Sequence, residues 1–128
     1  MLQLVQLQEI SMPRISASHL KKMRNSYRHE IARFLAKKAT SGFVVTYGEL
    51  TQQFGGTDRG WGDTLGGIAL RCREAEVPLL SVIVVSKATG MPSVDAVLYE
   101  DLGLSDPNAI RSEQQRCFDY DWVASPLG

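Results

Sequence analysis

Few residues of this chain have side chains that could do covalent or metal chemistry. The sequence contains two cysteines, Cys72 and Cys117, and two histidines, His19 and His29. A cysteine acts as a nucleophile only as a thiolate, which requires a nearby base or positive charge. Each cysteine here lies in an apolar or helical run, so we expect two reduced thiols that pack as small hydrophobic groups.

The remaining candidates do not combine into an active site. Both histidines fall in one basic, helical stretch, and a metal nuclease centre cannot be assembled from them. Ser81 is the one nucleophile candidate in a key apolar segment, but the sequence offers no base to activate it. We therefore expect a protein that is not an enzyme, with no cofactor and no metal site.

The charges are distributed unevenly, although the formal net charge is zero. Residues 1–40 contain eight Lys or Arg and two acids, whereas residues 89–128 contain two Arg and seven acids. Such a chain can present a basic face to nucleic acid while it stays neutral overall. In the alternative interpretation, the acidic tail folds over the basic helix and neutralises it. The sequence leaves both interpretations open.

A chain of 128 residues with 44% hydrophobic residues predicts one domain with a substantial core. No stretch is long and apolar enough for a membrane span, and the N-terminus does not read as a signal peptide. We expect a cytoplasmic protein without a membrane partner. The predicted parts are an arm at 1–15, a basic amphipathic helix at 16–41, a core unit at 43–92 and a C-terminal extension at 93–122.

The core unit carries the clearest local signals. Thr46 and Glu49 have the spacing of a capping box, and Gly55-Gly56 would end the helix that this box begins. A second helix comes next and carries Gly66 and Gly67, which cost about 1 kcal/mol each relative to alanine. Such a pair indicates that another helix or a phosphate approaches the backbone closely.

The apolar segment after the second helix completes the predicted fold. Residues 78–85 are almost all apolar and β-branched toward the end, which favours a strand covered on both faces. The polar turn at 87–90 then becomes a candidate wing. We therefore predict a mainly α member of the α/β class: a winged helix-turn-helix with a small β-hairpin wing and an additional N-terminal amphipathic helix.

These motifs resemble the DNA-binding half of the alkylguanine-DNA alkyltransferases and their inactive alkyltransferase-like relatives. The matching segments are Val45-Thr46-Tyr47-Gly48-Glu49-Leu50, Leu65-Gly66-Gly67-Ile68-Ala69 and Val77-Pro78-Leu79-Leu80, under half the chain. The resemblance implies a winged helix-turn-helix that enters the minor groove and flips a base, with Tyr47 near the target phosphate. A core tyrosine at a helix start is the alternative role for Tyr47.

The departures from that family concern its chemistry. Leu80-Ser81-Val82-Ile83 stands where the family has Pro-Cys-His-Arg, so the nucleophile and its activating histidine are missing. Asp63 stands where an arginine would hold the gap left by the flipped base. The chain is therefore not expected to transfer alkyl groups.

A second resemblance covers residues 45–122. The spacing from Leu65 through Pro78 and Gly90 to Tyr120-Asp121-Trp122 is similar to small bacterial and phage-associated domains found alone or beside HNH nucleases. This resemblance implies a restriction, defence or mobile-element context. The chain itself lacks the HNH residues.

Together these observations favour a non-catalytic module that binds duplex DNA with low sequence specificity, in a DNA repair, restriction, defence or phage context. The alternative is a protein-interaction module, such as an inhibitor or nuclease accessory subunit, on a winged-helix scaffold that no longer binds DNA. An enzyme of unrecognised chemistry is a third interpretation. The expected DNA-binding residues are Thr46, Tyr47, Arg59, Gly66, Gly67, Arg71, Arg73 and Lys87.

Overall fold

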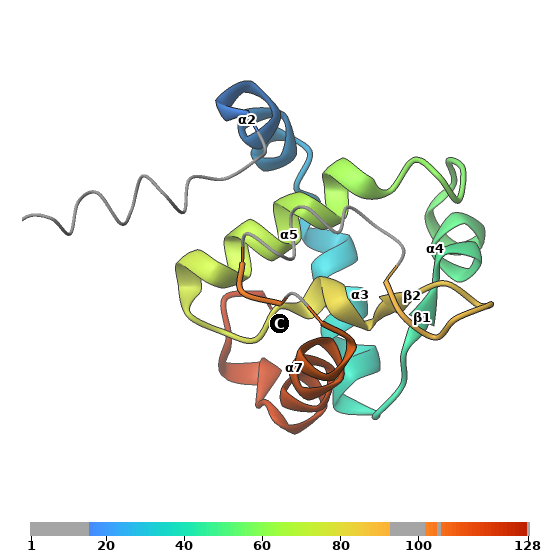
Figure 1. Cartoon of the computed structure of the whole chain (residues 1–128), viewed down its shortest axis with the longest axis vertical. Helices are drawn as coiled ribbons and strands as arrows, with labels where there is room; N and C mark the ends of the chain where they lie inside the picture. The colour runs from blue at the N-terminus through green and yellow to red at the C-terminus, as the bar shows by residue number, and fades with distance from the viewer. Residues whose placement is uncertain (1–15, 93–101, 105, 128) are drawn as a thin grey trace, which may run out of the picture.

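The structure is a computed structural model that describes residues 16–92, 102–104 and 106–127. The predicted arm and residues 93–101 of the predicted extension lie outside the described residues. The described part contains five α-helices, two short 3-10 helices and two strands (Figure 1). Their bounds are α2 Ala17–Asn25, α3 His29–Thr40, β1 Val45–Thr46, α4 Tyr47–Phe54, α5 Gly62–Ala75, η1 Leu80–Ile83, β2 Val84–Val85, α7 Pro107–Asp119 and η2 Trp122–Ala124.

The basic N-terminal region forms two helices, α2 and α3, in place of the single helix expected at 16–41. Ser26 ends α2, with its backbone N–H donating to the Lys22 and Met23 carbonyls and its hydroxyl donating to the Lys22 carbonyl. Arg28 is extended and begins α3. The apolar stripe that suggested one helix therefore serves two neighbours: α2 packs on α5, whereas α3 packs on η1 and α7.

The α4–α5 pair agrees closely with the sequence prediction. Thr46 accepts from the Glu49 N–H at 3.1 Å, and the Glu49 carboxylate accepts from the Thr46 N–H at 2.8 Å. This capping box begins α4, and Gly55, with φ +87°, ends it. A positive φ is strained for residues with a Cβ, which explains the glycine.

The predicted strand at 78–85 was wrong over most of its length. Leu80–Ile83 forms the 3-10 helix η1, and only Val84–Val85 is a strand. This strand pairs in parallel with β1, so the described residues contain no β-hairpin. After β2 the chain makes a closed turn, in which the Ser86 N–H donates to the Met91 carbonyl at 2.9 Å. The mainly helical class is confirmed, whereas the hairpin wing is not seen in this part of the chain.

Helix α7 holds η1 through buried polar side chains. The Glu113 carboxylate accepts from the Leu79 N–H at 2.7 Å, and the Gln114 amide donates to the Val82 carbonyl at 3.0 Å. These bonds satisfy backbone groups that a longer strand pairing would have used. Trp122 is buried and donates its indole N–H to the Cys117 carbonyl at 2.8 Å. The described part of the C-terminal extension is therefore integral to the core.

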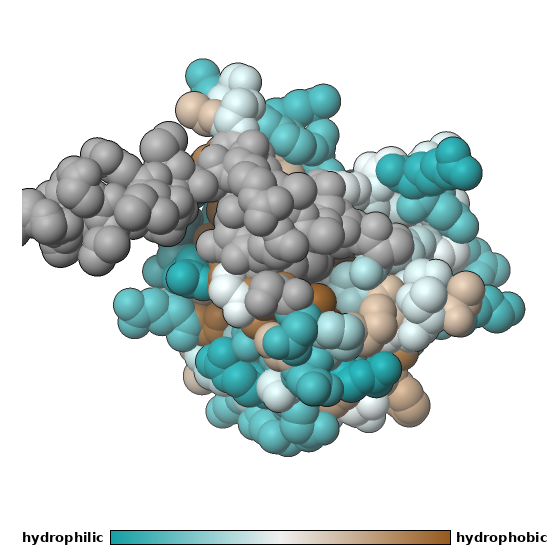
Figure 2. Space-filling view, viewed as in Figure 1, coloured by the Kyte–Doolittle hydropathy of each residue, from teal (hydrophilic) through white to brown (hydrophobic). Residues whose placement is uncertain are grey.

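The described surface on one face of the molecule is mainly hydrophilic. Figure 2 shows hydrophilic residues over much of the described surface on one face, with hydrophobic atoms exposed in smaller groups among them. None of the described helices is long and apolar enough to cross a membrane.

Candidate nucleic-acid interface

Four of the predicted DNA-binding residues come together at the N-terminal end of α4. Thr46 caps this helix and Tyr47 is its first residue. The parallel register pairs Thr46 with Val85, which places Lys87 only two residues beyond the paired strand. The loop that carries Arg59 also reaches this end, because a Cβ on Gly48 would lie 3.7 Å from an Asp58 carboxylate oxygen.

The α4 edge, which we define as Thr46, Tyr47, Arg59 and Lys87, has a mixed electrostatic character. Arg59 and Lys87 are exposed and positive. Glu49 and Asp58 lie in the same region, although Glu49 is committed to the capping box. The N-terminal end of a helix adds a partial positive charge. The α4 edge can therefore contact a few phosphates but does not form a strongly basic surface.

Tyr47 is half-buried and packs against the core cluster. Tyr47 therefore has, in part, the role of a core tyrosine at a helix start, which was the alternative to a phosphate contact. Its position at the start of α4 keeps it beside Thr46.

Gly66 and Gly67 lie elsewhere, buried beneath α2. A Cβ on Gly67 would stand 2.3 Å from the Met23 carbonyl oxygen, and one on Gly66 would stand 2.6 Å from the Met23 sulfur. The sequence indicated that either another helix or a phosphate approaches these glycines closely, and in the structure it is the helix α2. The glycine-rich face of α5 is therefore already covered, and a DNA groove cannot reach it while α2 is in place.

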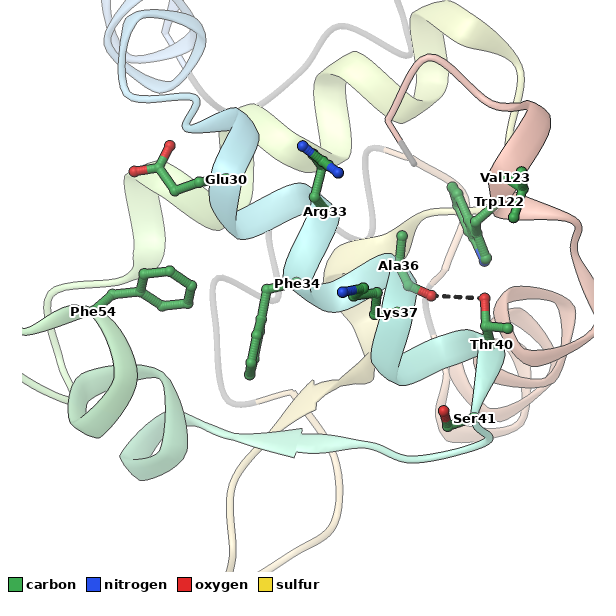
Figure 3. Close-up of a pocket in the computed structure, with 10 residues that line it drawn as sticks. All are labelled: Glu30, Arg33, Phe34, Ala36, Lys37, Thr40, Ser41, Phe54, Trp122 and Val123. Atoms are coloured by element: carbon green, nitrogen blue, oxygen red, sulfur yellow. Dashed lines mark hydrogen bonds between the residues drawn. The ribbon is translucent and has the colours of Figure 1, made fainter.

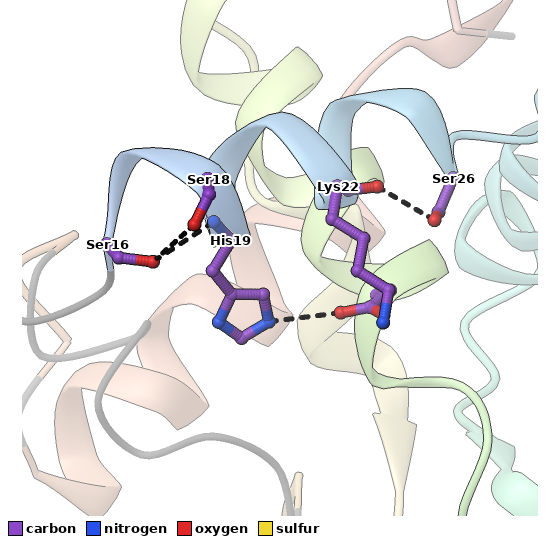
Figure 4. A network of polar contacts seen from close by, with 6 residues as sticks. Ser16, Ser18, His19, Lys22 and Ser26 are labelled. Atoms are coloured by element: carbon purple, nitrogen blue, oxygen red, sulfur yellow. Dashed lines mark hydrogen bonds and ion pairs between the residues drawn. The ribbon is translucent and has the colours of Figure 1, made fainter.

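Asp63 fixes the start of α2 to the start of α5. Its carboxylate oxygens lie 3.1 Å from His19 Nε2 and 3.4 Å from Lys22 Nζ. Figure 4 shows His19 and Lys22 projecting from the same face of α2, with Ser16 capping the helix. Asp63 thus holds α2 against α5, over the face that carries Gly66 and Gly67.

Arg71 and Arg73 are also separated from the α4 edge. The Arg71 guanidinium carbon lies 4.0 Å from the centroid of the Tyr27 ring, a cation–π contact. Arg73 donates to the Leu102 carbonyl at 3.1 Å. In Figure 1 the C-terminal end of α5 and the turn after β2 lie on opposite sides of the molecule. The eight predicted residues therefore do not form one positive face.

Sequence reasoning missed two cations on α3. Arg33 and Lys37 are exposed, and none of the ion pairs among the described residues involves them. The described acids of the C-terminal region, such as Asp119 and Asp121, therefore do not pair with these two side chains. In the sequence these two cations are four residues apart, so they share one side of a helix. A pair of this kind is also typical of an ordinary solvated helix face, and it therefore did not stand out.

The groups considered for chemistry are buried or engaged. Ser81 is 1% exposed within η1. His29 Nδ1 lies 2.9 Å from the Tyr27 hydroxyl, and His19 contacts Asp63. Among the residues that the structure describes, no group of three or more His, Cys, Asp or Glu could hold a metal ion.

Both thiols are held in the neutral form. Burial raises the pKa of Cys72 to about 12, and burial, together with the nearby Glu113 carboxylate, raises the pKa of Cys117. The Leu80 N–H donates to Cys72 Sγ at 3.5 Å, and Cys117 Sγ donates to the Leu79 carbonyl at 3.4 Å. These sulfurs therefore belong to the packing around η1.

We expect neither thiol to accept an alkyl group from duplex DNA that contains benzylguanine. With a pKa of about 12, Cys72 at pH 8 is only about one part in 10⁴ thiolate, and that fraction becomes substantial only as the pH approaches 12. Intact-mass spectrometry after incubation checks this. Iodoacetamide in guanidinium is the control and should label both cysteines, whereas stoichiometric benzyl transfer to either one in the folded protein would contradict the prediction.

Comparisons with protein-family models, with curated proteins and with solved structures find no match to this chain. The resemblance to alkyltransferases and to nuclease-associated domains therefore stays a hypothesis drawn from the sequence motifs. The fold itself defines a small, mainly helical domain with a two-strand parallel sheet.

Proposed function

We propose that this chain is a non-catalytic DNA-binding module that contacts the phosphate backbone through the α4 edge. The observation that carries the proposal is the meeting of Thr46, Tyr47, Arg59 and Lys87 at one end of α4. Cationic side chains, hydroxyl groups and a helix N-terminus are the groups that proteins use to hold phosphates.

The winged helix-turn-helix interpretation belongs to this proposal. Helices α4 and α5 supply the helix-turn-helix, and the closed turn from Ser86 to Met91 serves as a short wing. Because α2 covers the glycine face of α5, base edges are out of reach and contacts are limited to phosphates. Phosphate contacts carry no direct sequence information, so low specificity is the consequence.

The biological setting is proposed from the sequence resemblances alone. They support a role in DNA repair, restriction, defence or a phage, beside a nuclease or another protein partner. No chemistry on DNA is assigned to the chain itself, since its thiols are neutral and Ser81 is buried.

The salt dependence of DNA binding should be shallow. With Arg71 and Arg73 engaged away from the α4 edge, about two or three phosphate contacts remain, and the logarithm of the affinity should fall with the logarithm of salt at a slope of about −2 to −3. Arg59→Ala and Lys87→Ala should each flatten this slope by about one unit.

Fluorescence anisotropy with a duplex of roughly 20 base pairs measures these slopes directly. Arg111→Ala is the matched control, because Arg111 is also an exposed arginine but lies on α7, away from the α4 edge (Figure 1). Its slope should equal that of the wild type. If Arg111→Ala weakened binding as much as Arg59→Ala, the contact would not be localised at the α4 edge and the proposal would fail.

A further inference from the structure

A long groove runs along the exposed side of α3, away from the α4 edge. It has a volume of about 890 Å³ and lies between α4 on one side and η2 on the other (Figure 3). Its walls thus come from three elements that are far apart in the sequence. The residues that give the groove its character are Arg33, Phe34, Lys37, Phe54, Trp122 and Val123.

The floor of this α3 groove is apolar and fixed by its own contacts. Phe34 and Phe54 pack edge to face, with their ring centroids 5.3 Å apart. Trp122 is 2% exposed and its indole N–H is bonded to the Cys117 carbonyl. At the end of the groove, Val123 is 87% exposed, which is unusual for a large aliphatic side chain beside an apolar floor. The groove therefore offers apolar surface that no described residue covers.

The rim of the groove is positive. Arg33 and Lys37 stand one helical turn apart on α3, and Figure 3 shows both beside the groove. Lys38 does not line the groove itself, but its ammonium lies 5.5 Å from the centroid of the Phe34 ring, which does. The acid at this rim, Glu30, is paired with Arg28 at 2.8 Å. A ligand that brings carboxylates to Arg33 and Lys37 would complement this charge pattern.

We propose that the α3 groove binds an acidic amphipathic helix of a partner protein. The apolar face of such a helix would cover Phe34, Phe54 and Val123, in the helix-in-groove mode of recognition. Two carboxylates at i and i+4 of the partner would match the spacing of Arg33 and Lys37.

The same observations argue against nucleic acid in this groove. Single strands bind by stacking bases on open aromatic faces. Here Phe34 and Phe54 pack against each other, with Lys38 over Phe34 and Arg28 5.8 Å from the Phe54 ring centroid. Trp122 is buried. The aromatic side chains thus form a floor for aliphatic groups.

An NMR titration with a designed peptide tests this proposal. The probe is a helical peptide of about 14 residues, roughly four turns, with leucines at i, i+3 and i+7 and two glutamates four residues apart on the flanking side. The chain provides its own control, since Trp122 lines the groove, whereas Trp61 does not line it and donates its indole N–H to the Thr51 hydroxyl of α4. We expect saturable shifts of the Trp122 indole signal, with the Trp61 signal unmoved.

Charge variants complete the test. Arg33→Glu with Lys37→Glu should weaken peptide binding by about tenfold or more, and Val123→Asp should weaken it by a similar factor. Lys21→Glu with Arg111→Glu is the matched control, because this pair makes the same charge change on α2 and α7, outside the groove lining, and it should leave the affinity unchanged. A second peptide, in which lysines replace the glutamates, should not bind the wild-type protein.

Three results would overturn the proposal. They are no saturable shift at millimolar peptide, equal binding by wild type and the Arg33→Glu, Lys37→Glu variant, and displacement of the peptide by duplex DNA. The last result would assign the groove to nucleic acid. None of these outcomes depends on Arg59 or Lys87, so the DNA-binding proposal is tested separately.

Discussion

Replacing Glu113 with alanine is expected to lower the free energy of unfolding by about 3 kcal/mol. The Glu113 side chain is 9% exposed, and one of its oxygens accepts from the Leu79 N–H at 2.7 Å. Removing the carboxylate leaves this N–H buried without its acceptor and opens space between α7 and η1. Arg116, the other partner, is 61% exposed, so its loss contributes little.

Urea unfolding of Glu113→Ala and Glu113→Gln separates these causes. The glutamine variant keeps an acceptor for the Leu79 N–H and should lose only about 1 kcal/mol. Gln115→Ala is the control on the exposed side of α7, where Gln115 bonds Asp119, and it should change stability by less than about 0.5 kcal/mol. Equal losses in the alanine and glutamine variants would show that the Leu79 bond is not the stabilising contact.

Gly67→Ala is expected to destabilise the contact between α2 and α5 by about 2 kcal/mol. The added Cβ would stand 2.3 Å from the Met23 carbonyl oxygen and 3.1 Å from the Tyr27 backbone nitrogen. Both neighbours are backbone atoms, so α2 has to move. Overpacking of this kind costs about 1–3 kcal/mol or more, and the gain of about 1 kcal/mol in helix propensity offsets only part of it.

Two further glycines in α5 provide a graded control. A Cβ on Gly66 would meet the flexible Met23 side chain, and one on Gly62 would meet nothing within 4 Å. The expected order of stability is therefore Gly62→Ala above Gly66→Ala above Gly67→Ala, measured by thermal unfolding. Trypsin should also cleave at Lys21 or Lys22 fastest in Gly67→Ala. Identical behaviour of all three variants would mean that α2 does not pack on α5 in solution.

Local signals in the sequence predicted the local structure well. The Thr46–Glu49 capping box and the Gly55 stop depend only on neighbouring residues, and both are present. The low helix propensity of Gly66 and Gly67 also indicated correctly that another group approaches the α5 backbone closely. It could not say whether a helix or a phosphate approaches, because that depends on where α2 folds back.

The errors concern contacts between distant segments. Residues 80–83 have the composition of a strand, but Glu113 and Gln114, more than thirty residues away, bond the backbone around them as a 3-10 helix. The available signal was Gln114, which lies at helical spacing among the apolar residues Ile110, Cys117 and Phe118 of the predicted C-terminal extension. The break at Ser26 was hidden because one apolar stripe continues across α2 and α3.

The candidate DNA site was predicted only in part, because its residues too are brought together or kept apart by contacts between distant segments. Thr46, Tyr47 and Lys87 were chosen correctly as neighbours of one helix start, but the parallel pairing of β1 with β2 that brings them together was not predicted. Arg71 and Arg73 were chosen as exposed cations near the end of α5, but charge alone did not reveal Tyr27 and Leu102 as their partners.

The salt dependence of duplex binding by wild type and the Arg59→Ala, Lys87→Ala double variant tests the central claim most directly. We predict measurable wild-type binding at low salt with a slope of about −2 to −3, and a double variant whose slope is flatter by about two units. A wild-type protein that does not bind the duplex at low salt, or a double variant with an unchanged slope, would contradict DNA binding through the α4 edge.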